Sequence, residues 1–407
     1  MKTLILSALL PCLFSMSLTA KDWPQFRGPD GNGISTAKNL PKEWSATEHV
    51  KWRVPVPGGW SSPVMTNGKI YLTAADPLNK SDKPDLALKL ICLEQQSGKT
   101  IWQKTLFTTD GAAAPRIHKK NSNATPTPVI EGERIYVHFG HQGTAALNLD
   151  GTLIWKRDPL DYPPVHGQGA SPIIVDDLLV FSCDGKADPF IIALDKNTGK
   201  TRWKTARTTK PKKTFSFCSP TLIEVDGKAQ IISPGSGAVF AYAPDTGKEL
   251  WRCDYGEGYS VVPKPVYAHG LIFVSSGFDR PVLMAIKPGG EVAWETNRRA
   301  PLTPSKLVIG DELYFLSDNG VMTCANATDG EVHWQERVCG SVSASPIFSE
   351  GRIFVIDESG KAAVVNASKQ FKILAENELE ERTLASMAAT DGALYIRTLD
   401  HLYRIGK

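Results

Sequence analysis

The clearest structural unit in the chain is residues 171–203, SPIIVDDLLVFSCDGKADPFIIALDKNTGKTRW. Its short apolar runs are separated by Asp, Gly and Asn residues that favour turns, and the segment ends on Trp203. Short apolar runs between turn residues predict antiparallel strands rather than helices. With the segment around Trp203 as the last strand, the unit predicts a four-stranded sheet.

The same order of elements recurs along the chain. Further units begin at Ser62-Pro63, Thr127-Pro128, Ser219-Pro220, Lys264-Pro265, Thr303-Pro304 and Ser345-Pro346. Seven of the ten Trp residues follow this order and lie 40 to 53 residues apart, namely Trp52, Trp102, Trp155, Trp203, Trp251, Trp294 and Trp334. Four-stranded propeller blades repeat every 40 to 50 residues or so, and the spacing therefore predicts a β-propeller.

The two ends of the repeat region complete each other. The last unit, from Met387 to Ile405, lacks a fourth strand, whereas residues 50–54 form a fourth strand with no unit before it. A ring closed by pairing both ends leaves no open sheet edge to aggregate. We therefore predict an all-β, eight-bladed propeller of four-stranded antiparallel blades, with seven blades as the alternative.

The spaced Trp residues are predicted to be structural. Each follows a turn on the outermost strand, where a large planar side chain can cover the seam between neighbouring blades. The Gly residues before them, such as Gly199 and Gly247, supply turn positions with positive φ. These residues are the predicted docking positions of the ring.

Residues 193–203 resemble a known motif. The order Ala193, Asp195, Thr198-Gly199-Lys200 and Trp203 resembles the tryptophan-docking repeat of the pyrroloquinoline quinone (PQQ)-like propellers, and residues 241–251 repeat it closely. The resemblance covers residues 50–407 and implies the fold strongly and the function weakly. The segment from Asp22 to Pro29 also resembles the start of exported PQQ-like repeat proteins.

Three domains of the chain are predicted. Residues 1–20 have the layout of a secretory signal, with Lys2, an apolar stretch and the small residue Ala20. Residues 21–49 are an extension that packs on the propeller through Trp23, Phe26 and Trp44, and residues 50–407 are the propeller. We expect an exported protein, periplasmic or secreted, without a lipid anchor because Pro11 precedes Cys12 where a lipobox needs Gly or Ala.

The composition argues against two kinds of partner, nucleic acid and the membrane interior. The formal net charge is +3 and 22% of residues are charged, which argues against nucleic-acid binding. Beyond residue 20 no apolar run reaches the roughly 18 to 20 residues that span a bilayer. We expect a monomer whose partner is another protein, or a small molecule or saccharide bound at the face that carries the inter-blade loops.

The first of three functional hypotheses is a quinoprotein dehydrogenase. The resemblance implies PQQ and Ca²⁺ as cofactors for such an enzyme. Trp60, Lys213 and Arg298 are the candidates for cofactor binding, and Asp279, Asp318 and Asn319 are the candidates for the metal. The sequence lacks the adjacent cysteine pair that family enzymes often place against the cofactor.

The second hypothesis is a polysaccharide-active enzyme of the lyase type. Such an enzyme abstracts a sugar proton with His or Tyr and neutralises the sugar carboxylate with Arg. The candidate catalytic residues are His138, His141, His166, Tyr259, Arg280 and Arg382.

The third hypothesis is a non-catalytic binding or scaffold module, in the manner of the outer-membrane assembly factor BamB. The missing catalytic signatures and the near-neutral charge favour this hypothesis over the two enzymes. Among the cysteines, Cys183 and Cys218 are the pair to test for a disulfide, with buried free thiols as the alternative.

Overall fold

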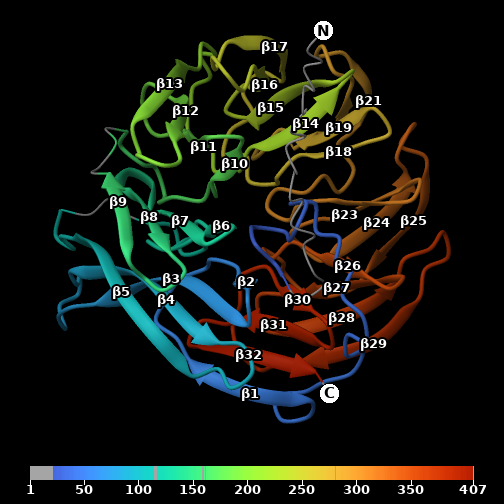
Figure 1. Cartoon of the computed structure of the whole chain (residues 1–407). Coiled ribbons are helices and arrows are strands. Elements are labelled where there is room, and N and C mark those ends of the chain that lie inside the picture. The colour runs from blue at the N-terminus through green and yellow to red at the C-terminus, as the bar shows by residue number, and fades with distance from the viewer. Residues whose placement is uncertain (1–21, 114–116, 158–159, 161, 280, 407) are drawn as a thin grey trace, which may run out of the picture.

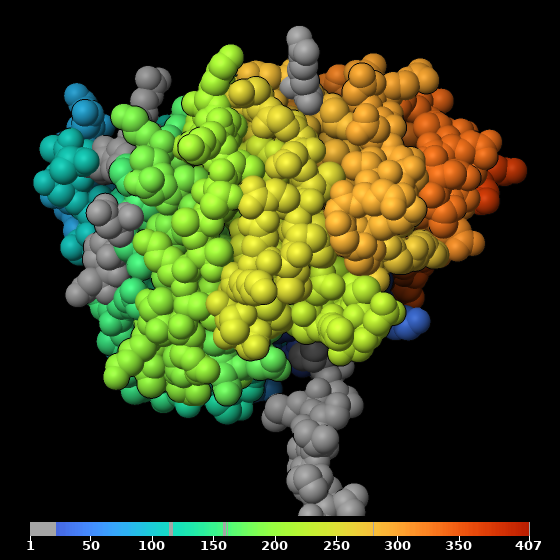
Figure 2. Space-filling view, turned by 90° about the horizontal axis from the view of Figure 1, so that it is seen from above, coloured from blue at the N-terminus to red at the C-terminus, as the bar shows by residue number. Residues whose placement is uncertain are grey.

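The computed structural model describes residues 22–407 except 114–116, 158–159, 161, 280 and 407. The predicted signal segment lies outside the described residues. Eight four-stranded antiparallel sheets surround a central channel (Figure 1), which confirms the all-β, eight-bladed prediction over the seven-bladed alternative. The side view shows successive blades following one another from green through yellow to orange (Figure 2).

The first blades follow the order of the chain, with the innermost strand first. Blades one and two contain β2 (Val64–Thr66), β3 (Lys69–Pro77), β4 (Leu86–Glu94), β5 (Thr100–Thr109), β6 (Val129–Glu131), β7 (Arg134–His138), β8 (Thr144–Asn148) and β9 (Leu153–Arg157). A short 3-10 helix, η1 (Gly140–Gln142), joins β7 to β8. Blades three and four contain β10 (Ile173–Val175), β11 (Leu178–Cys183), β12 (Phe190–Asp195), β13 (Thr201–Ala206), β14 (Thr221–Val225), β15 (Lys228–Pro234), β16 (Ala238–Tyr242) and β17 (Glu249–Asp254).

The later blades repeat this order until the last one. Blades five and six contain β18 (Val266–Ala268), β19 (Leu271–Ser275), β20 (Leu283–Ile286), β21 (Val292–Thr296), β22 (Leu307–Ile309), β23 (Glu312–Leu316), β24 (Val321–Asn326) and β25 (Val332–Arg337). Blades seven and eight contain β26 (Ile347–Ser349), β27 (Arg352–Ile356), β28 (Lys361–Asn366), β29 (Ile373–Glu378), β30 (Ala388–Thr390), β31 (Ala393–Arg397), β32 (His401–Gly406) and β1 (Val50–Pro55).

The eighth blade joins the two ends of the chain. β1 is its outermost strand and pairs antiparallel with β32, from Val50 opposite Ile405 to Pro55 opposite His401. Figure 1 shows the blue β1 alongside the red β32. The N-terminal strand thus completes the three-stranded C-terminal sheet and closes the ring, as the sequence predicts.

Burial differs between the middle and outer strands. The second strands β11, β19, β23 and β31 are buried along their whole length, whereas β1 alternates between half-buried and exposed residues. Both faces of a middle strand contact a neighbouring blade, and such strands have continuous apolar sequences. The core is therefore a series of layers between blades, such as the one joining Val180 and Ile191 to Ile231 and Phe240.

At most seams a Trp packs on a Gly of the next blade, whereas Trp334 packs on Phe371 and β29 has Leu374 in place of a Trp. The indole N–H of Trp155 donates to the Lys196 carbonyl at 2.9 Å, and a Cβ placed on Gly199 would lie 2.6 Å from the Trp155 ring. Trp203 has the same relation to Pro244 and Gly247 in the following blade. Trp52, Trp294 and Trp334 also donate to carbonyls of the next blade, whereas Trp251 donates to Gln230 of its own blade.

The Trp–Gly contact can be separated from backbone strain. Gly199 and Gly227 both have φ of 71°, but nothing lies within 4 Å of a Cβ on Gly227. Positive φ costs a non-Gly residue about 1–2 kcal/mol, and overpacking adds about 1–3 kcal/mol. We expect Gly199→Ala to lower the free energy of unfolding, measured in urea, by more than Gly227→Ala does. Equal losses would show that Gly199 serves only its turn.

The described cysteines are free, and the Cys183–Cys218 disulfide is wrong. Cys183 is at the end of β11 and packs in the layer between blades two and three. Cys218 lies instead at the channel, where its thiol donates to the Pro263 carbonyl at 3.3 Å. The two side chains are held in different layers, and the alternative of buried thiols describes both.

Candidate functional site

Hydroxyl groups surround the central channel. In six of the eight blades a residue just before the innermost strand donates its backbone N–H to a Ser or Thr hydroxyl of the next blade. For example, Thr127 N donates to Ser171 Oγ at 2.9 Å and Ser171 N to Ser219 Oγ at 2.8 Å. We call this set the hydroxyl ring: Ser62, Thr127, Ser171, Ser219, Ser305, Ser345 and Ser386.

In blade five, Lys264 stands at the position where the other blades have a Ser or Thr of the hydroxyl ring. Its backbone N–H donates to Ser305 Oγ at 3.0 Å, but it offers no hydroxyl to Ser219. The ring also corrects the unit start at Thr303-Pro304, because Ser305 and Lys306 hold the positions that Ser and Pro hold in most blades. Thr303 lies two residues before Ser305 and faces the same side, because alternate residues of an extended segment share a face.

The N-terminal extension closes the channel from the other side. Trp23 pairs with Met65 of β2, and Ile34 pairs with Phe348 of β26, so that residues 23–34 cross the channel. Figure 1 shows this blue segment running across the centre. We call residues 23–34 the plug. Phe26 of the plug forms part of the floor of a cavity of ≈ 350 Å³ on the loop face.

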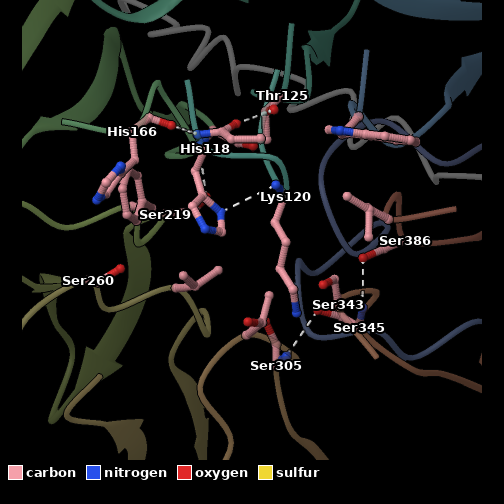
Figure 3. Close-up of a pocket in the computed structure, with 18 of the residues that line it drawn as sticks. His118, Lys120, Thr125, His166, Ser219, Ser260, Ser305, Ser343, Ser345 and Ser386 are labelled. Atoms are coloured by element: carbon pink, nitrogen blue, oxygen red, sulfur yellow. Dashed lines mark hydrogen bonds between the residues drawn. The ribbon is translucent and has the colours of Figure 1, made fainter. Parts of the chain in front are cut away.

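This cavity, the cup, has an aromatic wall. The rings of His118 and His166 are 5.5 Å apart, His166 is 5.3 Å from Phe215, and Phe215 is 5.4 Å from Tyr259. Trp60 lines the cup and is almost buried. The hydroxyl ring lines the same cavity, and Figure 3 shows four of its members, Ser219, Ser305, Ser345 and Ser386. Aromatic and hydroxyl surfaces of this kind suit a partly apolar ligand with a few hydrogen-bonding groups.

Lys120 carries the ionic contact of the cup. Figure 3 shows its side chain extending from the His118 side toward Ser343 and Ser345. Its Nζ lies 2.7 Å from Glu358 Oε1, which also accepts from Ser343 Oγ at 2.6 Å. Burial opposes ionisation of Glu358, but the hydrogen bonds from Lys120 and Ser343 hold its pKa below the usual value. Lys120 therefore ties the blade-two side of the cup to blade seven.

The structure brings part of the predicted site together. His166, Tyr259 and Trp60 line the cup. Lys213 lies at its edge, with Nζ 3.9 Å from the centre of the Tyr259 ring. Arg382 lies over Trp60, and its guanidinium donates to the Lys119 carbonyl at 3.0 Å.

His138 and His141 are not part of the cup. His138 ends β7, fully buried, with Nδ1 2.9 Å from Thr144 Oγ1 and its ring 4.1 Å from Phe181. Burial, with a smaller effect of His141, lowers the pKa of His138 to about 3. His141 contacts Gln168 in the wall between blades two and three. The pair thus belongs to the packing of this wall.

The remaining candidates also lie apart. Asp318 accepts hydrogen bonds from Leu302 N, Thr303 N and Thr303 Oγ1, Asn319 accepts one from Ser317, and Asp279 lies 3.7 Å from Lys213. Arg298 lines a small cleft beside Trp294 on the outside of blade five. Arg280 lies outside the described residues.

The cup does not fit PQQ held by Ca²⁺. Protein-bound Ca²⁺ takes about 6–8 oxygen ligands, typically including carboxylates. None of the described residues that line the cup is Asp or Glu, and the nearby Glu358 is engaged by Lys120 and Ser343. Across the described part of the chain, no group of three or more His, Cys, Asp or Glu residues is arranged to hold a metal.

Sequence reasoning missed several residues of the cup. Phe215, Phe217 and Phe278 supply much of its apolar lining, and Phe26 supplies the floor. Phe215, Phe217 and Phe278 lie outside the strands, in loops that have no repeated apolar pattern to mark them. The hydroxyl ring did leave a signal, since Ser or Thr precedes Pro at the start of most units.

A family model described as outer membrane protein assembly factor BamB matches residues 45–227, 235–369 and 282–400. The BamB of Shewanella oneidensis is 26% identical over 176 residues, which cover 38% of this chain and 42% of that protein. Quinohemoprotein alcohol dehydrogenase ADH-IIG of Pseudomonas putida is 25% identical over 236 residues, covering 51% of this chain and 31% of the enzyme. The matches span less than half the length of these relatives.

Among solved structures, BamB from Moraxella catarrhalis is similar with a TM-score of 0.62 and 15% sequence identity. The alignment covers 88% of this chain and 99% of that one. At this identity the likeness concerns the fold. Within the described residues, no helix has the length and apolar character needed to cross a bilayer.

Proposed function

Because the chain belongs to the family of the outer membrane protein assembly factor BamB, we propose that it is an exported, non-catalytic propeller that holds a segment of a partner protein in the cup. An assembly factor works by contacting other proteins, and the secretory layout of residues 1–20 supports export. The observation that carries the proposal is the cup itself, a closed-bottomed aromatic cavity on the loop face.

The lining of the cup supports a protein ligand. Energetic hot spots of protein interfaces are rich in Trp and Tyr and are surrounded by contacts that exclude water. Trp60, Phe215 and Tyr259 supply such rings, and Phe278 at the edge exposes 37% of its surface. The plug prevents a segment from threading through the channel. A side chain or short loop of the partner is therefore the proposed occupant.

Site-specific photocross-linking tests this proposal. A photoreactive phenylalanine analogue is placed at Phe278, which lines the cup, and at Leu250, an even more exposed apolar residue on the outer strand β17. In the native host, we expect one discrete adduct from position 278 and none from position 250. Mass spectrometry then identifies the partner.

Tyr259→Ala provides a second measurement. Removing an aromatic hot spot costs about 2 kcal/mol or more, which corresponds to at least a tenfold loss of affinity. We expect the adduct at position 278 to weaken accordingly while the protein keeps its unfolding midpoint. Adducts from both positions in similar yield, or none from position 278, would contradict binding in the cup.

A further inference from the structure

Three basic side chains are buried together under the floor of the cup. Arg27 belongs to the plug, Lys264 precedes β18, and Lys306 precedes β22, and their exposed fractions are 1%, 3% and 0%. The Arg27 guanidinium donates to the Lys306 carbonyl, and the Lys264 ammonium lies against the plug at Gly31, 2.2 Å from where a Cβ on that residue would be. Blades five and six and the plug thus each contribute a cation.

Other buried Arg residues of the propeller are compensated. Arg207 forms an ion pair with Asp184 at 2.7 Å, with both side chains fully buried. Among the described residues Arg397 has no ion pair, but both of its Nη atoms donate, to oxygens of Ser61, Thr73 and Pro57, and its Nε alone is buried without a partner. These arrangements show how this fold neutralises or solvates a buried guanidinium.

The cluster of Arg27, Lys264 and Lys306 lacks this compensation among the described residues. None of the three forms an ion pair there. Arg27 donates through Nη2 alone, to the Asn32 and Lys306 carbonyls, and its Nε and Nη1 are buried without a hydrogen-bond partner. Lys306 Nζ has only Ser275 Oγ at 3.2 Å, and Lys264 donates only through its backbone. The neighbouring Cys218 does not balance the charge, because burial raises the pKa of its thiol to about 12.

Buried like charges without a counter-charge are strongly destabilising. The two lysines reflect this environment, since burial, together with the charge of Arg27, lowers the pKa of each to about 7. An anion would supply the missing charge and use the free N–H groups of Arg27. Arg is suited to this role because its planar guanidinium binds oxyanions through paired hydrogen bonds.

The cluster adjoins the floor of the cup. Lys264 itself occupies a place in the hydroxyl ring, Lys306 follows Ser305, and Arg27 follows Phe26, and both Ser305 and Phe26 line the cup. Hydroxyl donors and cations therefore converge on this part of the channel, and none of the described lining residues is acidic.

We propose that Arg27, Lys264 and Lys306 form a binding site for a small oxyanion, a phosphate or a carboxylate, between the plug and blades five and six. The anion cross-links the plug to the ring, since its ligands come from both. The site goes beyond the proposed function and does not depend on any partner, so that isolated protein is sufficient to test it.

The first test is thermal unfolding of residues 22–407 at constant ionic strength, with chloride replaced by inorganic phosphate or by acetate. At pH 6 both lysines are charged, and we expect at least one of the two oxyanions to raise Tm by about 2–4 °C. The oxyanion that raises Tm shows whether the site binds a phosphate or a carboxylate. At pH 9 the lysines are largely neutral in the fold, and the rise is expected to shrink.

The pH dependence has a defined sign. The pKa of each lysine is lower in the fold than in the unfolded chain, so that the unfolded state binds more protons between these two values. Without oxyanion, stability is expected to fall as pH drops from about 10 to about 7. Arg27 stays charged through most of this range, the Cys218 thiol stays neutral, and the nearby Arg207–Asp184 pair stays ionised.

Variants locate the effect. Lys264→Met and Lys306→Met each remove a buried charge while keeping the length of the side chain, and we expect both to abolish the response without lowering Tm in chloride. Lys248→Met, at an exposed lysine, is the matched control and is expected to keep the full response. If one variant fails to fold, the other decides.

A direct measurement accompanies the unfolding data. Crystals grown with selenate are expected to show an anomalous peak within hydrogen-bond distance of Arg27. Equal oxyanion responses in wild type and both buried-lysine variants, or no response of the wild type at pH 6, would overturn the proposal.

Discussion

A chain that begins at residue 56, and therefore lacks β1, is expected to lose its monomeric, cooperatively unfolding state. Removal of β1 exposes the hydrogen-bonding edge of β32, because β1 is the outermost strand of blade eight. It also removes Trp52, whose indole N–H donates to the Gln95 carbonyl at 3.2 Å and thereby joins blade eight to blade one. An unpaired strand edge is a template for aggregation. Size-exclusion chromatography with light scattering measures the outcome.

The matched control begins at residue 45 and keeps β1 while removing the plug. This chain loses the buried Trp23 and Trp44 and is expected to be less stable, yet monomeric, because every sheet keeps its four strands. A monomeric chain from residue 56 that unfolds in one cooperative step would show that closure does not depend on β1.

The second large effect is expected from Asp184→Ala. Asp184 follows β11, and Arg207 also donates to Ser233 O, Ser233 Oγ and Ser182 Oγ. Removing the carboxylate leaves this guanidinium as an uncompensated buried charge, which costs about 3–5 kcal/mol. Urea unfolding should show a loss of this size in the free energy of unfolding.

A double variant separates the charge from the packing. Asp184→Leu combined with Arg207→Met replaces the ion pair with apolar side chains, and we expect it to regain much of the lost stability. Glu291→Gln breaks the exposed pair with Lys287 and serves as the surface control, with no measurable change expected. If Asp184→Ala behaved like Glu291→Gln, the buried pair would not stabilise the fold.

The architecture was accessible from the sequence because its signals are local. The turns and apolar runs of residues 171–203 define a blade, and the unit starts from Ser62 to Met387 count the blades. Contacts between blades were less accessible. Thr303-Pro304 matches the start of a unit by residue type, but the hydrogen bond that identifies Ser305 joins it to Ser345, 40 residues away.

In the candidate site, too, local signals could be predicted and contacts between blades could not. His166, Tyr259 and Trp60 were predicted from their place in the inter-blade loops, and they line the cup. His138 was misplaced because the last residue of β7 can point into the wall or into the loop, and only the position of Phe181 in the next blade decides. The cationic cluster was invisible for a further reason, since it needs the plug to bring Arg27 to Lys306.

The closure of blade eight also governs how such rings can grow. The strand that completes the last sheet comes from the start of the chain, so the repeat in the sequence and the sheet in space are out of phase by one strand. A duplication of one repeat between β2 and β25 inserts a complete sheet, with its own seam Trp and receiving Gly, and leaves the pairing of β1 with β32 untouched. Blade number can therefore change by gene duplication in one step, without an open intermediate.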